Sequence, residues 1–354
     1  MTHHGLQRSS ALTDRFGLID NAKAIGIILV VLGHSRGVPD YLSRVIFSFH
    51  VPLFFFLSGF LLKTSKLEAT VSRNVIKTLR ALAIPYLLFF LFAFAYWLVT
   101  RHVGTKAVLF AGQAWYEPVT GLFTGLEPDL YVDPPLWFFP CLIMTAILYQ
   151  VSRKFMAVPA STWLFAAIAF AVTMTWKYAA FRLPLGMDSM WIALSFYTIG
   201  QFVRDKRLLE NLRTIHLLLI FSLSSALLLY TGSFNDKVDL ANMVFGMRPE
   251  LYLLTSLLGI VATLSVSGLL PACGVGRWFS ANTLIIFPAH FVFLSLVRGM
   301  ATSLHIIPKD YNYALGWSVA STVLAILLCI PLAYCYRRLQ AFIDKPAMPG
   351  ITAG

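Results

Sequence analysis

Charged residues are scarce in this sequence. Asp, Glu, Lys and Arg together make up 12% of the 354 residues, whereas hydrophobic residues make up 58%. A soluble domain of this length carries about 25% charged residues, so the composition excludes an ordinary water-soluble fold. The long apolar runs indicate an integral membrane protein instead.

Cysteine is also scarce. The chain has four cysteines and no CxxC spacing, which argues against a disulfide framework and against a cysteine-based metal site; we expect no bound metal. The apolar run that follows Phe16 lacks an A-x-A cleavage signature, so it is read as a retained first span and not as a signal peptide.

Ten stretches are apolar and long enough to cross a bilayer, which requires about 20 residues. We predict an all-α polytopic protein with about ten transmembrane helices in one domain, 1–354, flanked by an N-terminal tail 1–16 and a C-terminal tail 337–354. No internal repeat is visible, which weakens an inverted-repeat transporter interpretation. The predicted spans are 17–36, 45–62, 79–99, 135–151, 159–176, 188–203, 214–231, 249–270, 281–300 and 314–336.

The distribution of Lys and Arg predicts the orientation of these spans. The side that carries both termini holds 17 Lys and Arg and 5 Asp and Glu, whereas the other side holds 10 of each. The basic side is expected to be cytoplasmic, so both termini are cytoplasmic. The net charge of +12 therefore reflects membrane topology, and the basic side is expected to attract anionic membrane lipids. No nucleic-acid partner is expected.

The first two spans carry ionisable residues at positions that a purely structural span would avoid. Asp20, Lys23 and His34 lie in the first span, and His50 opens the second. Lys23 and His34 are eleven residues apart, which places them on nearly one helix face and about 16 Å apart along the axis. A charge inside a membrane usually pairs, lines water or takes part in chemistry. The alternatives are that Asp20 and Lys23 lie at the interface, where lysine snorkels, and that each histidine is a packing residue.

Three strings in the first 90 residues carry a family resemblance. They are IDNAKAIGIILVVLGHS, FSFHVPLFFFLSGFLL and RALAIPYLLFF. Together they resemble acyltransferase family 3, and within it the branch of fucose 4-O-acetylases and exopolysaccharide acetyltransferases. Lys23 stands where the family usually has Arg, which keeps the charge but loses the planar bidentate fork.

The resemblance implies an O-acetyltransferase of the bacterial inner membrane. Such an enzyme would move acetyl from cytoplasmic acetyl-CoA to a sugar hydroxyl of a surface polysaccharide, or of its lipid-linked precursor, at the outer face. A hydroxyl needs a base as it attacks, and imidazole suits this task, so His34 is the expected base. Lys23 would stabilise negative charge with Asp20 orienting it, and His50 would lie on the acceptor side.

A basic segment is the expected donor site. Arg73, Lys77 and Arg80 follow i, i+4, i+7 spacing, which places them on one helix face where an anionic acetyl-CoA could dock as substrate. The alternative is an ordinary positive-inside loop. No bound cofactor is expected.

Two later clusters are acceptor or structural candidates. Asn282 and His290 are eight residues apart in the ninth span, with Pro288 between them; the alternative is that His290 satisfies carbonyls freed by the proline kink. Asp133 and Trp137 end a long acidic and aromatic loop, where carboxylates suit hydroxyls and aromatic faces suit sugars; the alternative is an interfacial belt.

Two other classes of function stay open. In a proton-coupled transporter or flippase of a lipid-linked glycan, Asp20, Lys23 and His34 would form a proton relay. In a multi-pass structural partner of a glycan assembly complex, these residues would do no chemistry.

Overall fold

The computed structural model describes residues 3–62, 71–153, 159–179, 181–308 and 313–343. Within these ranges the chain is helical, and the described residues contain no strand, only an isolated bridge between Asp239 and Val244. The predicted all-α class is confirmed. The four cysteines are free thiols.

Each of the ten predicted spans coincides with a long helix. The short helices α5 (Thr105–Leu109) and α6 (Val119–Thr124) and the 3₁₀ helix η2 (Pro184–Gly186) lie in the connections, whereas the 3₁₀ helix η1 (Pro134–Trp137) runs directly into α7. The long helices are α1 (His3–His34), α2 (Asp40–Leu61), α4 (Val71–Thr100), α7 (Phe138–Ser152), α8 (Pro159–Trp176), α9 (Ser189–Asp205), α10 (Thr214–Gly232), α11 (Pro249–Leu269), α12 (Gly274–Ser303) and α13 (Leu315–Ile343).

Eight helical segments of the described chain are long and apolar enough to cross a membrane: α1 from Gly17 onward, α2, α4, η1 together with α7 (Pro134–Ser152), α10, α11, α12 and α13. Helix α9 has 17 residues, and the apolar part of α8 is 163–176. The protein is therefore a multi-pass membrane protein. Ten crossings and cytoplasmic termini stay predictions.

The helix ends differ from the predicted span ends. Helix α1 begins at His3, inside the predicted N-terminal tail, and α13 continues to Ile343, inside the predicted C-terminal tail. Backbone hydrogen bonding continues past the apolar stretch because polar residues are compatible with a helix. Hydropathy marks the part of a helix that suits the bilayer and not the point where the helix ends. Residues 344–354 lie outside the described part.

Helix α2 is the centre of the bundle. Among the eight segments that are long and apolar enough to cross a membrane, it is the most buried, and it packs against α1, α9, α10 and α11. Glycines permit the closest crossing: a Cβ atom on Gly59 would lie 1.9 Å from the Tyr197 carbonyl oxygen, and one on Gly200 would lie 2.0 Å from the Phe56 carbonyl oxygen. Small residues of this kind allow two membrane helices to bring their backbones together.

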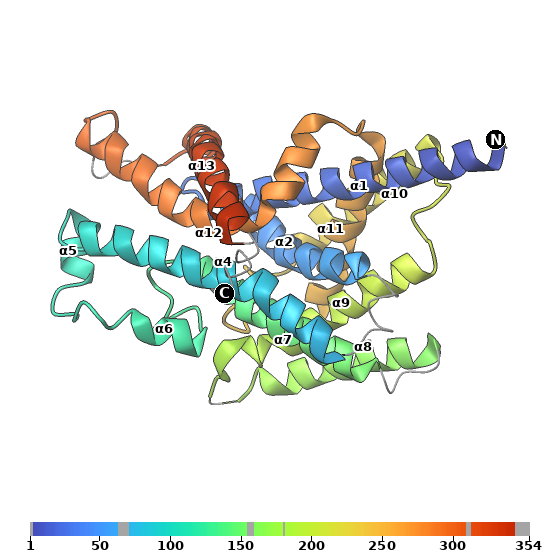
Figure 1. The fold of residues 1–354 in the computed structure, drawn as a ribbon, viewed down its shortest axis with the longest axis horizontal. Coiled ribbons are helices and arrows are strands. Elements are labelled where there is room, and N and C mark those ends of the chain that lie inside the picture. The colour runs from blue at the N-terminus through green and yellow to red at the C-terminus, as the bar shows by residue number, and fades with distance from the viewer. Residues whose placement is uncertain (1–2, 63–70, 154–158, 180, 309–312, 344–354) are drawn as a thin grey trace, which may run out of the picture.

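The packing of α1, α4 and α12 brings distant parts of the chain to one end of the molecule. Helix α12 packs against α1, α4 and α13. Figure 1 shows α5 and α6 at the end opposite the N-terminus, which lies at the right of that view. The last turns of α1, α4 and α12 meet at the α5 end and define the position of the site described next.

Candidate active site

His34 is the last residue of α1, and its hydrogen bonding determines its tautomer. Its Nδ1 lies 2.8 Å from the carbonyl oxygen of Val30, one turn earlier. A carbonyl can only accept, so Nδ1 carries a proton, and in the neutral imidazole Nε2 then presents a lone pair. The side chain is half-buried and faces a cavity. An imidazole held in this way is arranged to accept a proton.

Two further imidazoles surround His34. The centroid of the His290 ring lies 5.0 Å from that of His34, and the centroid of the His50 ring lies 6.1 Å from it. His50 donates from Nδ1 to the Ile46 carbonyl at 2.8 Å, and His290 donates from Nδ1 to the Phe287 carbonyl. The three rings come from α1, α2 and α12.

The structure bears on both interpretations of His290. The side chain is fully buried, and one nitrogen bonds a helix carbonyl, as the packing alternative requires. The other nitrogen, Nε2, has no hydrogen-bond partner among the described residues. His290 therefore belongs to the imidazole cluster as well as to its own helix. No group of three or more His, Cys, Asp or Glu in the described residues could hold a metal ion.

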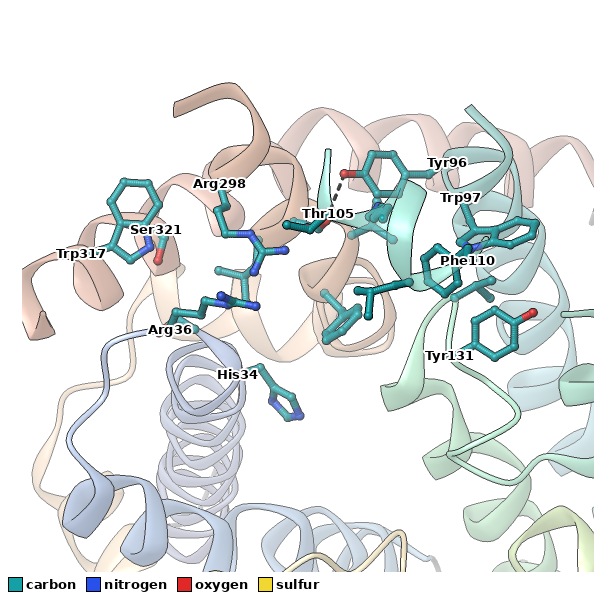
Figure 2. A pocket seen from close by; sticks show the side chains of 18 residues that line it. His34, Arg36, Tyr96, Trp97, Thr105, Phe110, Tyr131, Arg298, Trp317 and Ser321 are labelled. Carbon is teal, nitrogen blue, oxygen red and sulfur yellow. Dashed lines mark hydrogen bonds between the residues drawn. The ribbon is translucent and has the colours of Figure 1, made fainter. Parts of the chain in front are cut away.

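The cavity beside His34, called the His34 cavity below, has a volume of about 300 Å³. Its lining comes from the end of α1, α4, α5, α12, α13 and residues 131–132. Figure 2 shows His34 with Arg36 and Arg298 on one side and a group of aromatic rings on the other. The cavity is large enough for a small polar substrate next to the imidazole.

The aromatic side of the cavity is a contiguous wall. The ring centroids of Trp97 and Phe110 are 5.6 Å apart, those of Phe110 and Tyr131 are 5.6 Å apart, and those of Trp97 and Tyr131 are 6.1 Å apart. The indole N–H of Trp97 and the hydroxyl of Tyr131 are buried without a hydrogen-bond partner in the described residues. A wall of this kind offers aromatic faces, which suit the apolar face of a ligand in the cavity.

Three cations that were not predicted as site residues also line the His34 cavity: Arg36, Lys106 and Arg298. Burial and the charge of Arg298 lower the pKa of Lys106 to about 8. Its ammonium donates to Thr100 Oγ1 at 2.8 Å and lies 4.2 Å from the centroid of the Tyr96 ring. The sequence contained these cations, but as loop and helix-end charges they counted only toward topology.

Asp20 and Lys23 lie away from the His34 cavity. Both are half-buried on α1 one turn apart, and the charge of Asp20 acts on Lys23. Neither lines the His34 cavity. The eleven-residue step from Lys23 to His34 corresponds to about 16 Å along the helix. These two residues occupy the opposite half of the bundle.

A second cavity of about 290 Å³ lies toward the other end of α4. Two of the three basic residues predicted for the donor site, Lys77 and Arg80, line it together with the end of α13, including Tyr336. Arg73 is exposed on the same helix but is not part of the lining. Residues Arg80 and Tyr96 on α4 border the two cavities and are about 24 Å apart along the helix.

The remaining predicted site residues lie outside the His34 cavity. Asp133 is fully buried with neither carboxyl oxygen hydrogen-bonded to a described residue, and burial raises its pKa well above the usual range. Trp137 is buried in η1, whereas Tyr131, from the same loop, lines the cavity. Asn282 accepts from Arg337 Nη2 at 2.7 Å and donates to the Trp278 carbonyl at 2.7 Å, which ties α12 to α13.

Comparisons with known proteins identify the family of this chain. Neither a curated protein nor a solved structure matches the chain. The family model for the acyltransferase domain of acyltransferase family 3 matches residues 16–334, a range that includes the imidazole cluster and the described lining of the His34 cavity. This match covers nearly the whole chain, and the protein accordingly belongs to acyltransferase family 3 and is a multi-pass membrane acyltransferase.

Proposed function

We propose that this protein is an O-acetyltransferase of the bacterial inner membrane. It takes acetyl from cytoplasmic acetyl-CoA and modifies a sugar hydroxyl of a surface polysaccharide, or of its lipid-linked precursor, at the opposite face. The observation that carries the proposal is His34: its Nδ1 proton is committed to Val30, so Nε2 is available as a base in a cavity of about 300 Å³.

The transfer follows from the protonation state of His34. A sugar hydroxyl in the cavity donates its proton to Nε2 as its oxygen attacks the thioester carbonyl. The new C–O bond forms and the C–S bond breaks. The departing thiolate takes the proton back from the imidazolium, so His34 returns to its starting tautomer and free CoA and an acetyl ester remain.

The donor arrives from the other side of the bundle. Acetyl-CoA is strongly anionic, and Lys77 and Arg80 supply exposed cations at the rim of the second cavity. This end is the one that the distribution of Lys and Arg predicts to be cytoplasmic. Lys23, with Asp20 beside it, lies between this end and His34, where it can stabilise negative charge on the donor.

The test uses membranes that contain the protein, radiolabelled acetyl-CoA and the native glycan. We expect label on the glycan as an ester, and we expect His34→Gln to abolish it while the amount of protein in the membrane stays unchanged. The matched control is His216→Gln, because His216 is exposed on α10 and lies outside the cavity.

The rival class gives a different result. If the glycan crosses the membrane without gaining an ester, and His34→Gln blocks the crossing, the protein is a proton-coupled transporter or flippase and the enzyme proposal fails. Full acetylation by His34→Gln would overturn the base assignment alone. An active His34→Gln variant would thus leave the acetyltransferase assignment standing.

A further inference from the structure

The His34 cavity contains a concentration of positive charge. Arg36 follows α1, Lys106 lies in α5 and Arg298 lies near the end of α12, so three separate segments bring their cations to one cavity. Arg298 is close enough to both Arg36 and Lys106 for their charges to repel. Figure 2 shows the side chains of Arg36 and Arg298 directed toward each other above His34.

The described lining of this cavity contains no acidic residue. Aromatic faces hold two of the cations instead: the Arg36 guanidinium lies 5.6 Å from the centroid of the Tyr313 ring, and Lys106 lies over Tyr96. An aromatic face attracts a cation without occupying all its N–H donors, which stay available to a ligand.

Another arginine at the same end of the bundle shows the contrast. Arg182 forms an ion pair with the buried Asp188 and also donates to the Ala241 carbonyl at 2.7 Å. Its charge is balanced within the protein. The described lining of the His34 cavity holds no such carboxylate for its three cations, of which Lys106 and Arg298 are half-buried and Arg36 is exposed. An anion bound among them would offset the repulsion between Arg298 and the other two.

We propose that Arg36, Lys106 and Arg298 bind a phosphate or diphosphate group attached to the acceptor sugar. This inference rests on the proposed function, because it names the class of acceptor that the His34 cavity receives. Two guanidinium forks and one ammonium match the several oxygens and the multiple charge of a diphosphate. A single carboxylate would neutralise one of the three charges.

The arrangement also explains how the sugar is positioned. With its phosphate on the cation cluster, the sugar lies between the cluster and the aromatic wall of Trp97, Phe110 and Tyr131, and His34 is on the cluster side. Anchoring one end of a substrate in this way lowers the entropic cost of placing a hydroxyl at the base. The cations therefore act in binding and positioning, and His34 in proton transfer.

The test measures binding of inorganic pyrophosphate to the purified full-length protein in detergent. We expect saturable binding that competes with the acceptor, and a dissociation constant about tenfold or more weaker for Arg298→Gln or Lys106→Gln, since each loses a charge-assisted contact. The matched control is Arg248→Gln. It removes one exposed positive charge from the same end of the bundle, outside the cavity lining, and should bind as the wild type does.

Further arms distinguish the source of the anion and separate this inference from the proposed function. Glucuronate serves as the carboxylate probe, and vesicles with a polyprenyl diphosphate sugar serve as the membrane-borne probe. Pyrophosphate and the vesicle lipid should bind more tightly than glucuronate. Equal binding of glucuronate, no binding of pyrophosphate, or equal losses in Arg248→Gln and Arg298→Gln would overturn the phosphate site. Ester formation on a neutral glycan in the same preparation would show that the acetyltransferase itself still stands.

Discussion

The imidazoles of His34 and His290 lie edge to face, with centroids 5.0 Å apart and an interplanar angle of 65°. One ring ends α1 and the other follows Pro288 within α12, so the pair exists only because these two helices pack together. Nδ1 of His290 donates a hydrogen bond to the Phe287 carbonyl, whereas its Nε2 has no hydrogen-bond partner among the described residues. A buried polar atom without a partner costs stability, so its presence beside His34 calls for an explanation, and a role in catalysis supplies one.

Replacing His290 should therefore reduce catalysis more than stability. His290→Phe keeps the volume and aromatic packing but removes the polar nitrogen beside His34. We expect kcat to fall by about tenfold or more, while KM for acetyl-CoA stays unchanged. The measurement is steady-state transfer by purified protein, with thermal unfolding in parallel. An equal loss in His216→Phe, or a loss of folding without a catalytic change, would assign His290 to packing alone.

The second cavity, which Lys77 and Arg80 line, gives a prediction about KM for acetyl-CoA and not about kcat. Lys77→Gln and Arg80→Gln should each raise KM for acetyl-CoA about threefold to tenfold with kcat at saturation preserved, because they remove long-range attraction for an anionic donor. Lys206→Gln is the control, since Lys206 is exposed at the predicted cytoplasmic end and does not line that cavity. Arg73→Gln should have a smaller effect than either variant. A change in kcat alone would place Lys77 and Arg80 outside donor binding.

Apolar run length located the helices well but not the site. All ten predicted spans fall on helices because hydrophobicity over about 20 residues is a local property of the chain. His34 and His50 were recognisable because their separation along the sequence is short. Their proximity to His290 depends on how α12 packs against α1, and no local pattern encodes that packing.

The remaining site residues show the same limit. Asn282 and His290 lie on one helix, yet Asn282 accepts a hydrogen bond from Arg337 whereas His290 lies edge to face with His34. Spacing gave their relative positions on the helix but not their partners. Lys106 and Arg298 were present in the charge count, and only their convergence in three dimensions distinguishes them from ordinary loop cations.

Acceptor binding should depend on pH through Lys106. Its pKa is lowered to about 8, so the ammonium is charged below that pH and neutral above it. The contribution of Lys106 to the attraction for an anionic acceptor is thus complete below about pH 7 and is lost as the pH rises toward about pH 9. The groups that face Lys106 are Arg298 from α12 and Tyr96 and Thr100 from α4.

The wild-type KM for the acceptor should therefore rise about tenfold across this range. Lys106→Arg keeps a positive charge at all of these pH values, so its KM should stay flat. The measurement is acceptor KM at saturating acetyl-CoA for both proteins over the same buffers. Parallel pH profiles would show that another group titrates.

The crossing of α2 and α9 predicts where the fold tolerates no added atom. Gly59→Ala would place a methyl group 1.9 Å from the Tyr197 carbonyl oxygen, a backbone atom that moves only if a helix moves. We expect the free energy of unfolding to fall by about 1–3 kcal/mol, as in an overpacked core. Gly200→Ala, against the Phe56 carbonyl oxygen, should behave in the same way.

The matched control for this prediction is Gly299→Ala. Gly299 lies inside α12, and a Cβ there would meet no atom within 4 Å. Alanine has the higher helix propensity, so this variant should be as stable as the wild type or more stable by up to about 1 kcal/mol. Thermal unfolding of the purified proteins in detergent, followed by tryptophan fluorescence, compares the three variants. If Gly59→Ala and Gly299→Ala unfold at the same temperature, the backbones of α2 and α9 do not meet at these glycines. The crossing of α2 and α9 would then not be what holds His50, on α2, beside His34.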